Sequence, residues 1–203
     1  MLTPVSSRQS QRQLSATPGV VRIIGGTWRG SKLAVPARPG LRPTPDRVRE
    51  TLFNWLAPVI AGARCLDLFA GTGALGLEAA SRGAGEVVLV ERDRDALAAL
   101  HGHVQRLRAD PGRVRIVAGD ALDLLRIPPA QPFNLVFLDP PYDAGLMAPA
   151  LAGLRAGGWL APGALLYCEW PQEQPPPLAQ PPWRAGRAGS VQFALYRAQP
   201  DPG

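Results

Sequence analysis

The distribution of apolar residues changes character at residue 64. From there on, short runs rich in apolar and β-branched residues alternate with segments whose apolar residues recur every three or four positions. The runs predict strands at 64–69, 86–91, 113–118, 133–138 and 164–169, and the other segments predict helices at 74–82, 93–108, 121–125 and 146–155. Because strands that alternate with helices usually pair in parallel, this order predicts an α/β fold whose sheet is covered on both faces.

The C-terminal part breaks this alternation. A proline-rich segment at 171–182 is followed by two short runs at 183–185 and 191–197, which flank a turn at 186–190. Two runs of this kind around a turn predict an antiparallel pair. The expected sheet is therefore seven-stranded and mostly parallel, with an antiparallel C-terminal hairpin.

The N-terminal part has a plan of its own. Strands are predicted at 20–24 and 32–35, on either side of a glycine-rich segment that is typical of a hairpin turn. A helix is expected to follow, with Thr44 as its N-cap and Pro45 at its first position, where a missing N–H costs nothing. From Val48 onward its apolar residues recur at helical spacing, which gives it one buried face. A small β-hairpin and a helix are therefore expected before the main sheet.

Length and composition fit one domain. The chain has 203 residues, 46% of them hydrophobic, which is enough for a single core. No apolar run approaches the roughly 18 residues that a membrane span requires. Cys65 and Cys168 stand far apart among apolar residues, so we expect the reduced core thiols of a cytoplasmic protein. Residues 1–19 lack the apolar core of a secretory signal, and we interpret them as a disordered leader before a single domain at 20–203.

The positive charge is concentrated near the N-terminus. The whole chain carries a formal charge of +6, whereas residues 1–50 hold nine Lys and Arg against Asp46 and Glu50, a net of +7. Such a one-sided basic segment is typical of a protein that binds a polyanion. The candidate nucleic-acid contacts lie on or beside the glycine-rich turns of 20–45, and they are Arg22, Arg29, Lys32, Arg38 and Arg42.

A glycine-rich loop follows the strand predicted at 64–69. It contains Gly-x-Gly-x-x-Gly, and Glu91 comes 20 residues after Gly71, at the end of the next predicted strand. Nicotinamide, flavin and S-adenosylmethionine sites all use this spacing. Asp67 favours S-adenosylmethionine, because a carboxylate repels the pyrophosphate of a dinucleotide and attracts an ammonium and a sulfonium.

Further residues extend this predicted cofactor site. Glu91 can accept hydrogen bonds from both ribose hydroxyls, and Asp120 is placed to accept one from the adenine amino group. Asp120 can also be the N-cap of the helix that follows it, and the two roles are compatible. The helix N-terminus capped by Thr44 can face the cofactor's carboxylate. The candidate cofactor-binding residues are Asp67, Phe69, Gly71, Gly73, Glu91, Asp120, Ala121 and Thr44.

The strongest chemical signal is the segment Asp139-Pro140-Pro141-Tyr142, which follows the fourth strand beside the glycine-rich loop. The exocyclic amine of a base is a poor nucleophile, because its lone pair is delocalised into the ring. Two acceptors on its N–H groups favour the tetrahedral geometry that attack on a methyl group requires. Asp139 and the carbonyl of Pro140, held in a stiff diproline turn, can be those acceptors. Tyr142 can stack on an extruded base, so all four residues are candidate catalytic residues that need no metal.

These motifs resemble those of a known family. The segment 139–142 matches the motif of amino-group methyltransferases that act on nucleic acids, and the expected sheet resembles the Rossmann-like sheet of class I methyltransferases. The segments 22–26, 28–30, 40–44 and 46–56 are similar to those of the bacterial 16S ribosomal RNA guanine-N2 methyltransferases, the RsmD family. The match runs from about residue 21 to residue 169, and the leader and the proline-rich segment depart from the family pattern.

The resemblance implies an S-adenosylmethionine-dependent enzyme that methylates the N2 amine of a single guanine during assembly of the small ribosomal subunit. The expected partner is 16S ribosomal RNA or the assembling subunit, and no membrane is expected. The resemblance further implies a cytoplasmic monomer whose N-terminal hairpin engages RNA.

Three other functions share parts of this pattern. A DNA adenine or cytosine amino-methyltransferase has the same tetrapeptide, but it usually adds a large target-recognition domain for which this chain has no room. A non-catalytic RNA-binding assembly factor needs neither Asp67 nor Asp139. A nicotinamide-dependent oxidoreductase is disfavoured by Asp67.

Several conspicuous residues are assigned to structure instead. His101 and His103 are two positions apart on a predicted helix, so they point to different sides and are expected at the surface, not at a metal. Arg106 and Arg108 are expected on a solvated face away from the hairpin. Trp28 can either stack on RNA or anchor the hairpin to the core.

Overall fold

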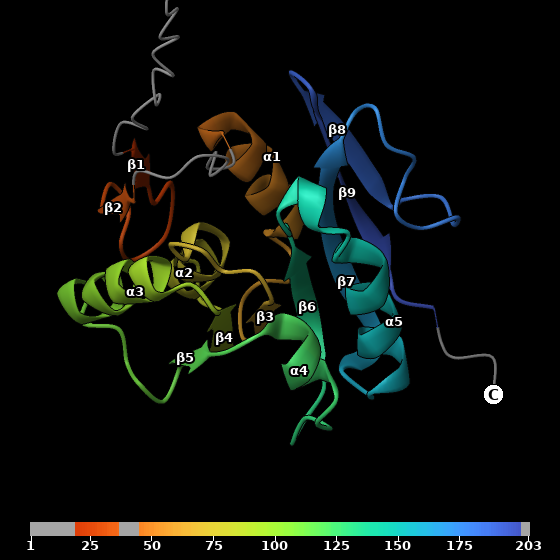
Figure 1. The fold of residues 1–203 in the computed structure, drawn as a ribbon. Helices are drawn as coiled ribbons and strands as arrows, with labels where there is room; N and C mark the ends of the chain where they lie inside the picture. Colours follow the sequence, from red (N-terminus) through yellow and green to blue (C-terminus); the bar gives the residue numbers. More distant parts are fainter. Residues whose placement is uncertain (1–18, 37–44, 200–203) are drawn as a thin grey trace, which may run out of the picture.

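The computed structural model describes residues 19–36 and 45–199. Some predictions therefore lie outside the described residues, namely the leader apart from Gly19 and the roles of Arg38, Arg42 and Thr44. The described chain forms a seven-stranded sheet with helices on both faces and a separate two-stranded hairpin (Figure 1).

The main sheet has the strand order β5-β4-β3-β6-β7-β9-β8. Its strands are β3 (Arg64–Asp67), β4 (Glu86–Glu91), β5 (Val114–Ala118), β6 (Phe133–Leu138), β7 (Leu160–Pro171), β8 (Arg184–Ala188) and β9 (Val191–Arg197). Strands β3 to β7 are parallel, and β9 pairs antiparallel with both β7 and β8. The predicted fold, a mostly parallel sheet that ends in an antiparallel hairpin, is confirmed.

Helices cover both faces because the strands are apolar on both sides. They are α1 (Asp46–Leu56), α2 (Ala74–Ser81), α3 (Arg94–Arg106), α4 (Ala121–Leu125) and α5 (Met147–Ala156), with a short 3-10 turn, η1 (Tyr142–Ala144). Adjacent strand residues face opposite sides, so Cys65 packs in the core under α1, α2 and α3 and Leu66 in the core under α4 and α5. Cys65 and Cys168 are buried free thiols, as the sequence predicts.

The chain reverses its direction across the sheet between β3 and β6. It runs outward from β3 through β4 to β5 and then returns to the other side of β3 as β6. Asp67, the last residue of β3, lies opposite Phe137 of β6, so the segments that follow these strands leave the sheet side by side. Such a reversal opens a crevice at the carboxyl ends of the strands, where α/β proteins bind ligands. The glycine-rich loop and the segment 139–142 both begin there.

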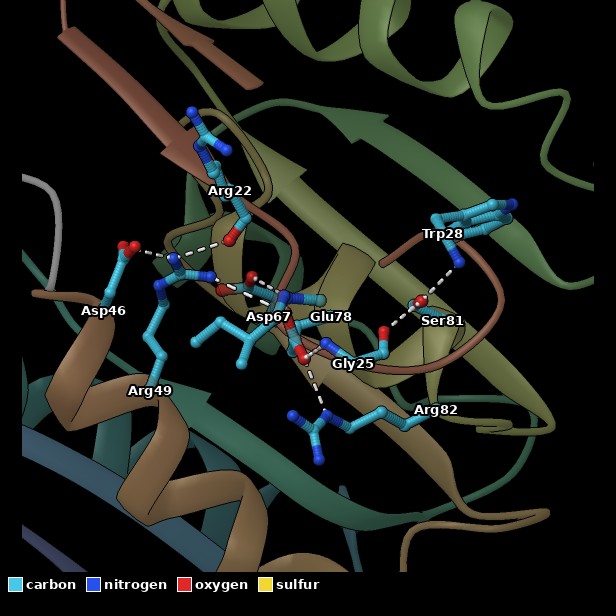
Figure 2. A network of polar contacts seen from close by, with 11 residues as sticks. Arg22, Gly25, Trp28, Asp46, Arg49, Asp67, Glu78, Ser81 and Arg82 are labelled. Atoms are coloured by element: carbon cyan, nitrogen blue, oxygen red, sulfur yellow. Dashed lines mark hydrogen bonds and ion pairs between the residues drawn. The ribbon is translucent and has the colours of Figure 1, made fainter. Parts of the chain in front are cut away.

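The N-terminal hairpin consists of β1 (Gly19–Arg22) and β2 (Lys32–Val35), and its turn is docked on α2 (Figure 2). The backbone N–H groups of Ile24 and Gly25 donate to the carboxylate of Glu78 at 2.6 and 2.9 Å. Glu78 has no exposed surface, so these bonds lie in the interior. The hairpin is therefore attached to the helix that begins at the glycine-rich loop.

Glycines and a serine complete this attachment. A Cβ on Gly26 would lie 1.9 Å from the backbone oxygen of Ser81, so only glycine fits there. The Ser81 hydroxyl donates to the carbonyl of Gly25 at 2.6 Å and accepts from the N–H of Trp28 at 2.9 Å. Trp28 packs against the core under α1, α2 and α3. Of the two roles expected for Trp28, stacking on RNA and anchoring the hairpin, the structure thus shows the second. We call this contact the hairpin dock: the segment 24–28 on Glu78 and Ser81.

A buried ion-pair network joins α1 to the hairpin dock. Arg49 is fully buried and donates to the carbonyl of Arg22 and to Asp46, both at 2.7 Å. A second nitrogen of its guanidinium lies 3.7 Å from Glu78, and Arg82 donates to Glu78 at 2.6 Å. A single carboxylate thus connects the hairpin, α1 and α2, as Figure 2 shows.

Some element boundaries differ from the predicted ones. The first helix begins at Asp46 with Pro45 as its N-cap, one residue later than predicted. Strand β7 is longer than 164–169, because it pairs with β6 on one side and β9 on the other. Strand β8 begins at Arg184 and continues to Ala188, where it pairs with Val191 of β9.

Candidate active site

Two glycines with left-handed backbone shape the turn between β3 and α2. Gly71 and Gly73 have φ angles of +54° and +82°, which other residues rarely adopt. A Cβ on Gly73 would lie 2.5 Å from the Leu100 side chain, whereas the described residues, chain neighbours aside, place no heavy atom within 4 Å of a Cβ on Gly71. The backbone of Gly71 therefore faces open space that a ligand can approach. Phe69 lies half-buried just before this turn.

Asp67 is buried beneath the turn. Its carboxylate accepts a hydrogen bond at 2.9 Å from the N–H of Gly76, near the start of α2. Burial raises the pKa of Asp67 to about 7; the Gly76 bond acts in the opposite direction, and the charge of Glu91 raises the pKa further. Asp67 thus braces the turn from within, a role that the sequence analysis did not assign. Its attraction of a cationic ligand stays a prediction.

Glu91 connects the end of β4 to the same turn. One carboxylate oxygen accepts from the N–H of Gly71 at 2.7 Å, and the other accepts from those of Arg92 and Asp93 at 2.9 and 2.7 Å. The side chain is half-buried. Because a carboxylate offers about four acceptor positions, Glu91 retains capacity for a further donor such as a ribose hydroxyl.

Asp120 is the N-cap of α4, one of the two roles expected for it. One oxygen accepts from the N–H groups of Leu122 and Asp123 at 2.8 and 3.4 Å, and the other pairs with Arg92 at 3.0 Å. The Leu122 bond is the main cause of the lowered pKa of Asp120. Ala121, the first residue of α4, is buried. The contact of Asp120 with adenine stays a prediction.

The segment 139–142 leaves the end of β6 beside the glycine-rich turn. Asp139 is half-buried, Pro140 is buried and Pro141 is exposed. Tyr142 begins η1 and is 38% exposed, so its side chain is partly open to solvent at the edge of the sheet. Because the two prolines carry no N–H, this turn presents carbonyl acceptors without competing donors of its own. The structure thus brings the predicted catalytic and cofactor segments to adjacent strand ends.

A second carboxylate, Glu169 of β7, lies at this edge and was missed by the sequence analysis. It is 3% exposed and follows Cys168, which pairs with Leu138 in the parallel ladder. Its two oxygens accept hydrogen bonds from the hydroxyls of Tyr142 and Tyr167, each at 2.9 Å. The available sequence signal was a lone acid at the end of an apolar strand, next to the strand that carries the tetrapeptide.

The charges around these tyrosines keep their hydroxyls protonated. Burial raises the pKa of Tyr142 and of Tyr167 above 10, and the negative charges of Glu169 and Asp139 raise both further. Both hydroxyls therefore remain hydrogen-bond donors over the ordinary pH range. Because the charge of Asp139 raises the pKa of both tyrosines, Asp139 and Glu169 lie in one corner of the site. Glu169 is the more buried of the two acids. We call Asp139, Tyr142, Tyr167 and Glu169 the carboxylate corner.

His103 of α3 is buried, so the prediction that it lies at the surface is wrong. The N–H of Ala34 in β2 donates to its Nε2 at 2.9 Å, and its Nδ1 lies 3.0 Å from the carbonyl of Thr72 in the glycine-rich turn. Because Nε2 accepts, Nδ1 carries the proton and donates to Thr72. Burial lowers the pKa of His103, which favours this neutral form. The imidazole thus links the glycine-rich turn to the hairpin.

The basic candidates of the described hairpin, Arg22, Arg29 and Lys32, are exposed. Arg106, at the end of α3, donates to the backbone carbonyl of Lys32. Arg106 therefore lies beside the hairpin, and the prediction that it faces away from it is wrong. A groove of about 560 Å³ at this junction is lined by hairpin residues and by Arg106 and Leu107, and none of its lining residues is acidic.

Within residues 19–36 and 45–199, no three His, Cys, Asp or Glu side chains gather into a group that could hold a metal ion. In the same ranges, no helix is both long and apolar enough to cross a membrane.

Comparison with known proteins finds relatives that match along most of the chain. The family model described as "Conserved hypothetical protein 95" matches residues 21–197. The ribosomal RNA small subunit methyltransferase D of Escherichia coli K12 is 49% identical over 184 residues, which cover 89% of this chain and 91% of that protein. The protein of the same name from Haemophilus influenzae is 44% identical, with 88% and 94% covered. The solved structure of Escherichia coli yhhF gives a TM-score of 0.77 at 49% identity and covers 88% of this chain and 98% of that one.

Proposed function

The chain belongs to the family of ribosomal RNA small subunit methyltransferase D, and we propose that it methylates the exocyclic N2 amine of a guanine in 16S ribosomal RNA, with S-adenosylmethionine as the methyl donor. The proposal includes a monomer, with one methyltransferase domain at 20–203, that acts in the cytoplasm while the small subunit is assembled. The substrate is either the 16S RNA itself or the assembling subunit.

One observation carries this proposal. The glycine-rich turn after β3 and the tetrapeptide after β6 leave neighbouring parallel strands, with Asp67 opposite Phe137, at the point where the sheet reverses its order. A methyl donor held at the first segment therefore lies beside an amine held at the second. Transfer between two bound molecules requires this kind of proximity.

The donor set around the glycine-rich turn fits S-adenosylmethionine. Gly71 leaves open space at the turn, and three acids lie at the ends of the strands around it: Asp67 and Glu91 are the last residues of β3 and β4, and Asp120 comes two residues after β5. Negative charge disfavours a pyrophosphate and favours a cationic ligand. When bound, S-adenosylmethionine supplies an electrophilic methyl group on its sulfonium. We propose that Glu91 accepts hydrogen bonds from the ribose and Asp120 one from the adenine, with Thr44 near the carboxylate, as the sequence suggests.

The tetrapeptide orients the amine. Asp139 accepts one N–H of the exocyclic amine and the carbonyl of Pro140 accepts the other, which directs the nitrogen lone pair toward the methyl group. The base stacks on the ring of Tyr142 after it leaves its helix. The exposed surface of Tyr142 and the burial of Pro140, two residues before it, support this arrangement.

The RNA phosphates are proposed to lie along the hairpin. Arg22, Arg29 and Lys32 are exposed there, and Arg106 extends the positive charge onto α3. The groove that Lys32 and Arg106 line carries no acid, so nothing in its lining opposes a phosphate. Arg38 and Arg42, outside the described residues, remain candidates from the sequence.

Transfer of tritiated methyl groups from S-adenosylmethionine tests the function. Assembled small subunits, naked 16S ribosomal RNA and DNA are supplied in parallel, with the Asp139→Ala variant as the matched control. We expect label in ribosomal RNA, from one or both RNA substrates, and none in DNA. Label in DNA alone supports a DNA amino-methyltransferase, and no label in any substrate supports a non-catalytic assembly factor.

A further inference from the structure

We propose that Glu169 is a positioning residue that fixes the ring of Tyr142 in the orientation in which it stacks on the target base. The inference rests on the proposed function, because it assigns a role in base methylation to a residue that no motif includes. It concerns a side chain that does not itself touch the base.

The carboxylate corner is built around one buried acid, Glu169. Glu169 is 3% exposed, and a buried carboxylate is unfavourable unless its oxygens are hydrogen-bonded. Its two oxygens accept from two tyrosines of different character. Tyr167 is fully buried two residues earlier on the same strand, so this bond belongs to the rigid sheet. Tyr142 is 38% exposed and comes from η1, so the second bond joins an exposed ring to Glu169, whose backbone is held by the pairing of β7 with β9.

The hydrogen bond from Tyr142 to Glu169 restrains the ring of Tyr142. Tyr142 is held at its backbone by the turn that follows two prolines and at its hydroxyl by Glu169, 27 positions away in the chain. Fixing these two ends sets the long axis of the ring. Because a phenolic O–H lies in the plane of its ring, the bond to Glu169 also favours the rotation of Tyr142 in which that plane contains the carboxylate oxygen. A ring that is already oriented loses little conformational entropy when the base binds. The stacked base then places its exocyclic amine within reach of Asp139.

Two roles of Glu169 can be distinguished: it can position Tyr142, or it can only stabilise the core. If Glu169 only stabilised the fold, its buried bond to Tyr167 would matter as much as its bond to Tyr142. If Glu169 acts through Tyr142, loss of the Tyr142 hydroxyl should reproduce the effect on turnover, and loss of the Tyr167 hydroxyl should not. The chain therefore contains its own matched control.

The experiment is a double-mutant cycle on methyl transfer to 16S ribosomal RNA. We expect Tyr142→Phe and Glu169→Leu each to lower kcat roughly tenfold, the scale of one hydrogen bond to a charged group. The double variant should lose no more than the stronger single variant, since both remove the same contact. Glu169→Gln, which keeps an acceptor oxygen, should restore part of the rate, and Tyr167→Phe should stay within about twofold of wild type. Affinity for S-adenosylmethionine should be unchanged in all of them.

Multiplied losses in the double variant, or an equal loss in Tyr167→Phe, overturn the proposal. A second readout does not depend on activity. The chain has three tyrosines, so protein labelled with 3-fluorotyrosine gives three ¹⁹F signals that single Tyr→Phe variants assign. Glu169→Leu should shift and broaden the Tyr142 signal and leave that of Tyr196 in place. If the Tyr142 signal does not move in Glu169→Leu, the positioning role is wrong, whatever the activity of the protein. If the wild type methylates no substrate, the proposed function is wrong, and the ¹⁹F result still tests the positioning role.

Discussion

The hairpin dock and the carboxylate corner are each built around one buried glutamate, but they use it differently. At the dock, Glu78 receives two backbone N–H groups and the guanidinium of Arg82, so its partners belong to the protein interior. At the corner, Glu169 receives two side-chain hydroxyls, one of them from a tyrosine that is 38% exposed. The first arrangement fixes one part of the fold to another, whereas the second fixes a surface side chain.

The difference predicts which property each region controls. Backbone N–H donors and ion pairs that are completely buried contribute to stability, and removing their acceptor leaves them unsatisfied. A hydroxyl that holds a ring at the surface contributes little to folding, but it decides where a ligand meets the protein. Substitutions at the dock should therefore change stability first, and substitutions at the corner should change turnover first.

The largest effect is expected at the dock. Glu78→Ala leaves Arg82 and two backbone N–H groups without their acceptor and removes the carboxylate paired with the buried Arg49. It should lower the free energy of unfolding by about 3–5 kcal/mol. Urea unfolding measures this change. The matched control is Asp123→Ala, which removes the acid of an exposed ion pair with Arg126 and should leave stability nearly unchanged. Equal stabilities of the two variants would contradict the importance assigned to the dock.

Asp139→Ala should have the largest effect on chemistry. It removes one of the two acceptors that orient the amine, so turnover should fall by roughly 10²–10³, the scale for one oriented polar group in a transition state. Calorimetric titration should show nearly unchanged affinity for S-adenosylmethionine, and urea unfolding nearly unchanged stability. Near-normal turnover in this variant would remove Asp139 from the catalytic residues.

Cofactor affinity should depend on the acids at the glycine-rich turn. Glu91→Ala should weaken S-adenosylmethionine binding by roughly tenfold or more through the lost ribose contacts. Asp67→Ala should weaken it as well, because it removes both the attraction of the cation and the bond to Gly76. Isothermal titration of each variant gives the dissociation constants. Unchanged binding in both variants, or tight binding of NAD to the wild type, would refute the cofactor assignment.

A smaller effect is expected on the pH dependence of stability. Burial raises the pKa of Asp67 from 3.8 to about 7, so the folded state binds this proton more tightly than the unfolded chain does. Its contribution to stability is therefore complete below about pH 4 and is lost as the pH rises toward 7. His103 has a lowered pKa, so its contribution is present above its ordinary value of 6.5 and is lost as the pH falls.

The two variants Asp67→Asn and His103→Asn should thus differ from wild type with opposite pH slopes. The stability advantage of wild type over Asp67→Asn should shrink between pH 4 and pH 7, and its advantage over His103→Asn should grow as the pH rises through 6.5. Urea unfolding across this range measures both. Curves for both variants that run parallel to that of wild type would contradict the two pKa shifts.

The smallest effects concern the RNA surface. Each lost phosphate contact should reduce the slope of log affinity against log salt by about 0.7–0.9. The double variant with Arg29→Ala and Lys32→Ala should therefore lower the slope by about twice this amount. Arg106→Ala should lower it by about the value for one contact. Arg126, the C-cap of α4, is paired with Asp123, and Arg126→Ala is the control that should leave the slope unchanged. A slope that falls only in the Arg126 variant would place the RNA on the other face of the sheet.

The sequence was informative where a pattern is local. Alternating apolar runs predicted all seven strands of the main sheet. The spacing of Gly71 and Glu91 and the tetrapeptide at Asp139 predicted a site at one edge of the sheet, and the structure brings these segments to neighbouring strand ends. Asp120 was predicted to cap the helix that follows it and to accept a hydrogen bond from adenine. The capping role, which depends only on neighbouring residues, is confirmed.

The residues that sequence analysis missed depend on remote partners. Glu78 precedes Arg82 by four positions, which is typical of a surface pair, yet it is buried by a hairpin 53 residues earlier in the chain. His103 was assigned to the surface because its partners, Ala34 and Thr72, are 69 and 31 positions away. Glu169 meets Tyr142 only because β7 pairs with β6 in one particular register. Helical or strand periodicity contains no information on such contacts.

If the crevice at the strand ends methylates the N2 amine of guanine in 16S ribosomal RNA, as we propose, the modified nucleoside can be detected directly. The most direct measurement is mass spectrometry of nucleosides digested from unmodified 16S RNA, free and in small subunits, after incubation with the protein and S-adenosylmethionine. The account predicts N2-methylguanosine, close to one per RNA molecule, with wild type and almost none with Asp139→Ala in the same time. A product methylated on adenine or cytosine, or N2-methylguanosine formed equally well by Asp139→Ala, would contradict it.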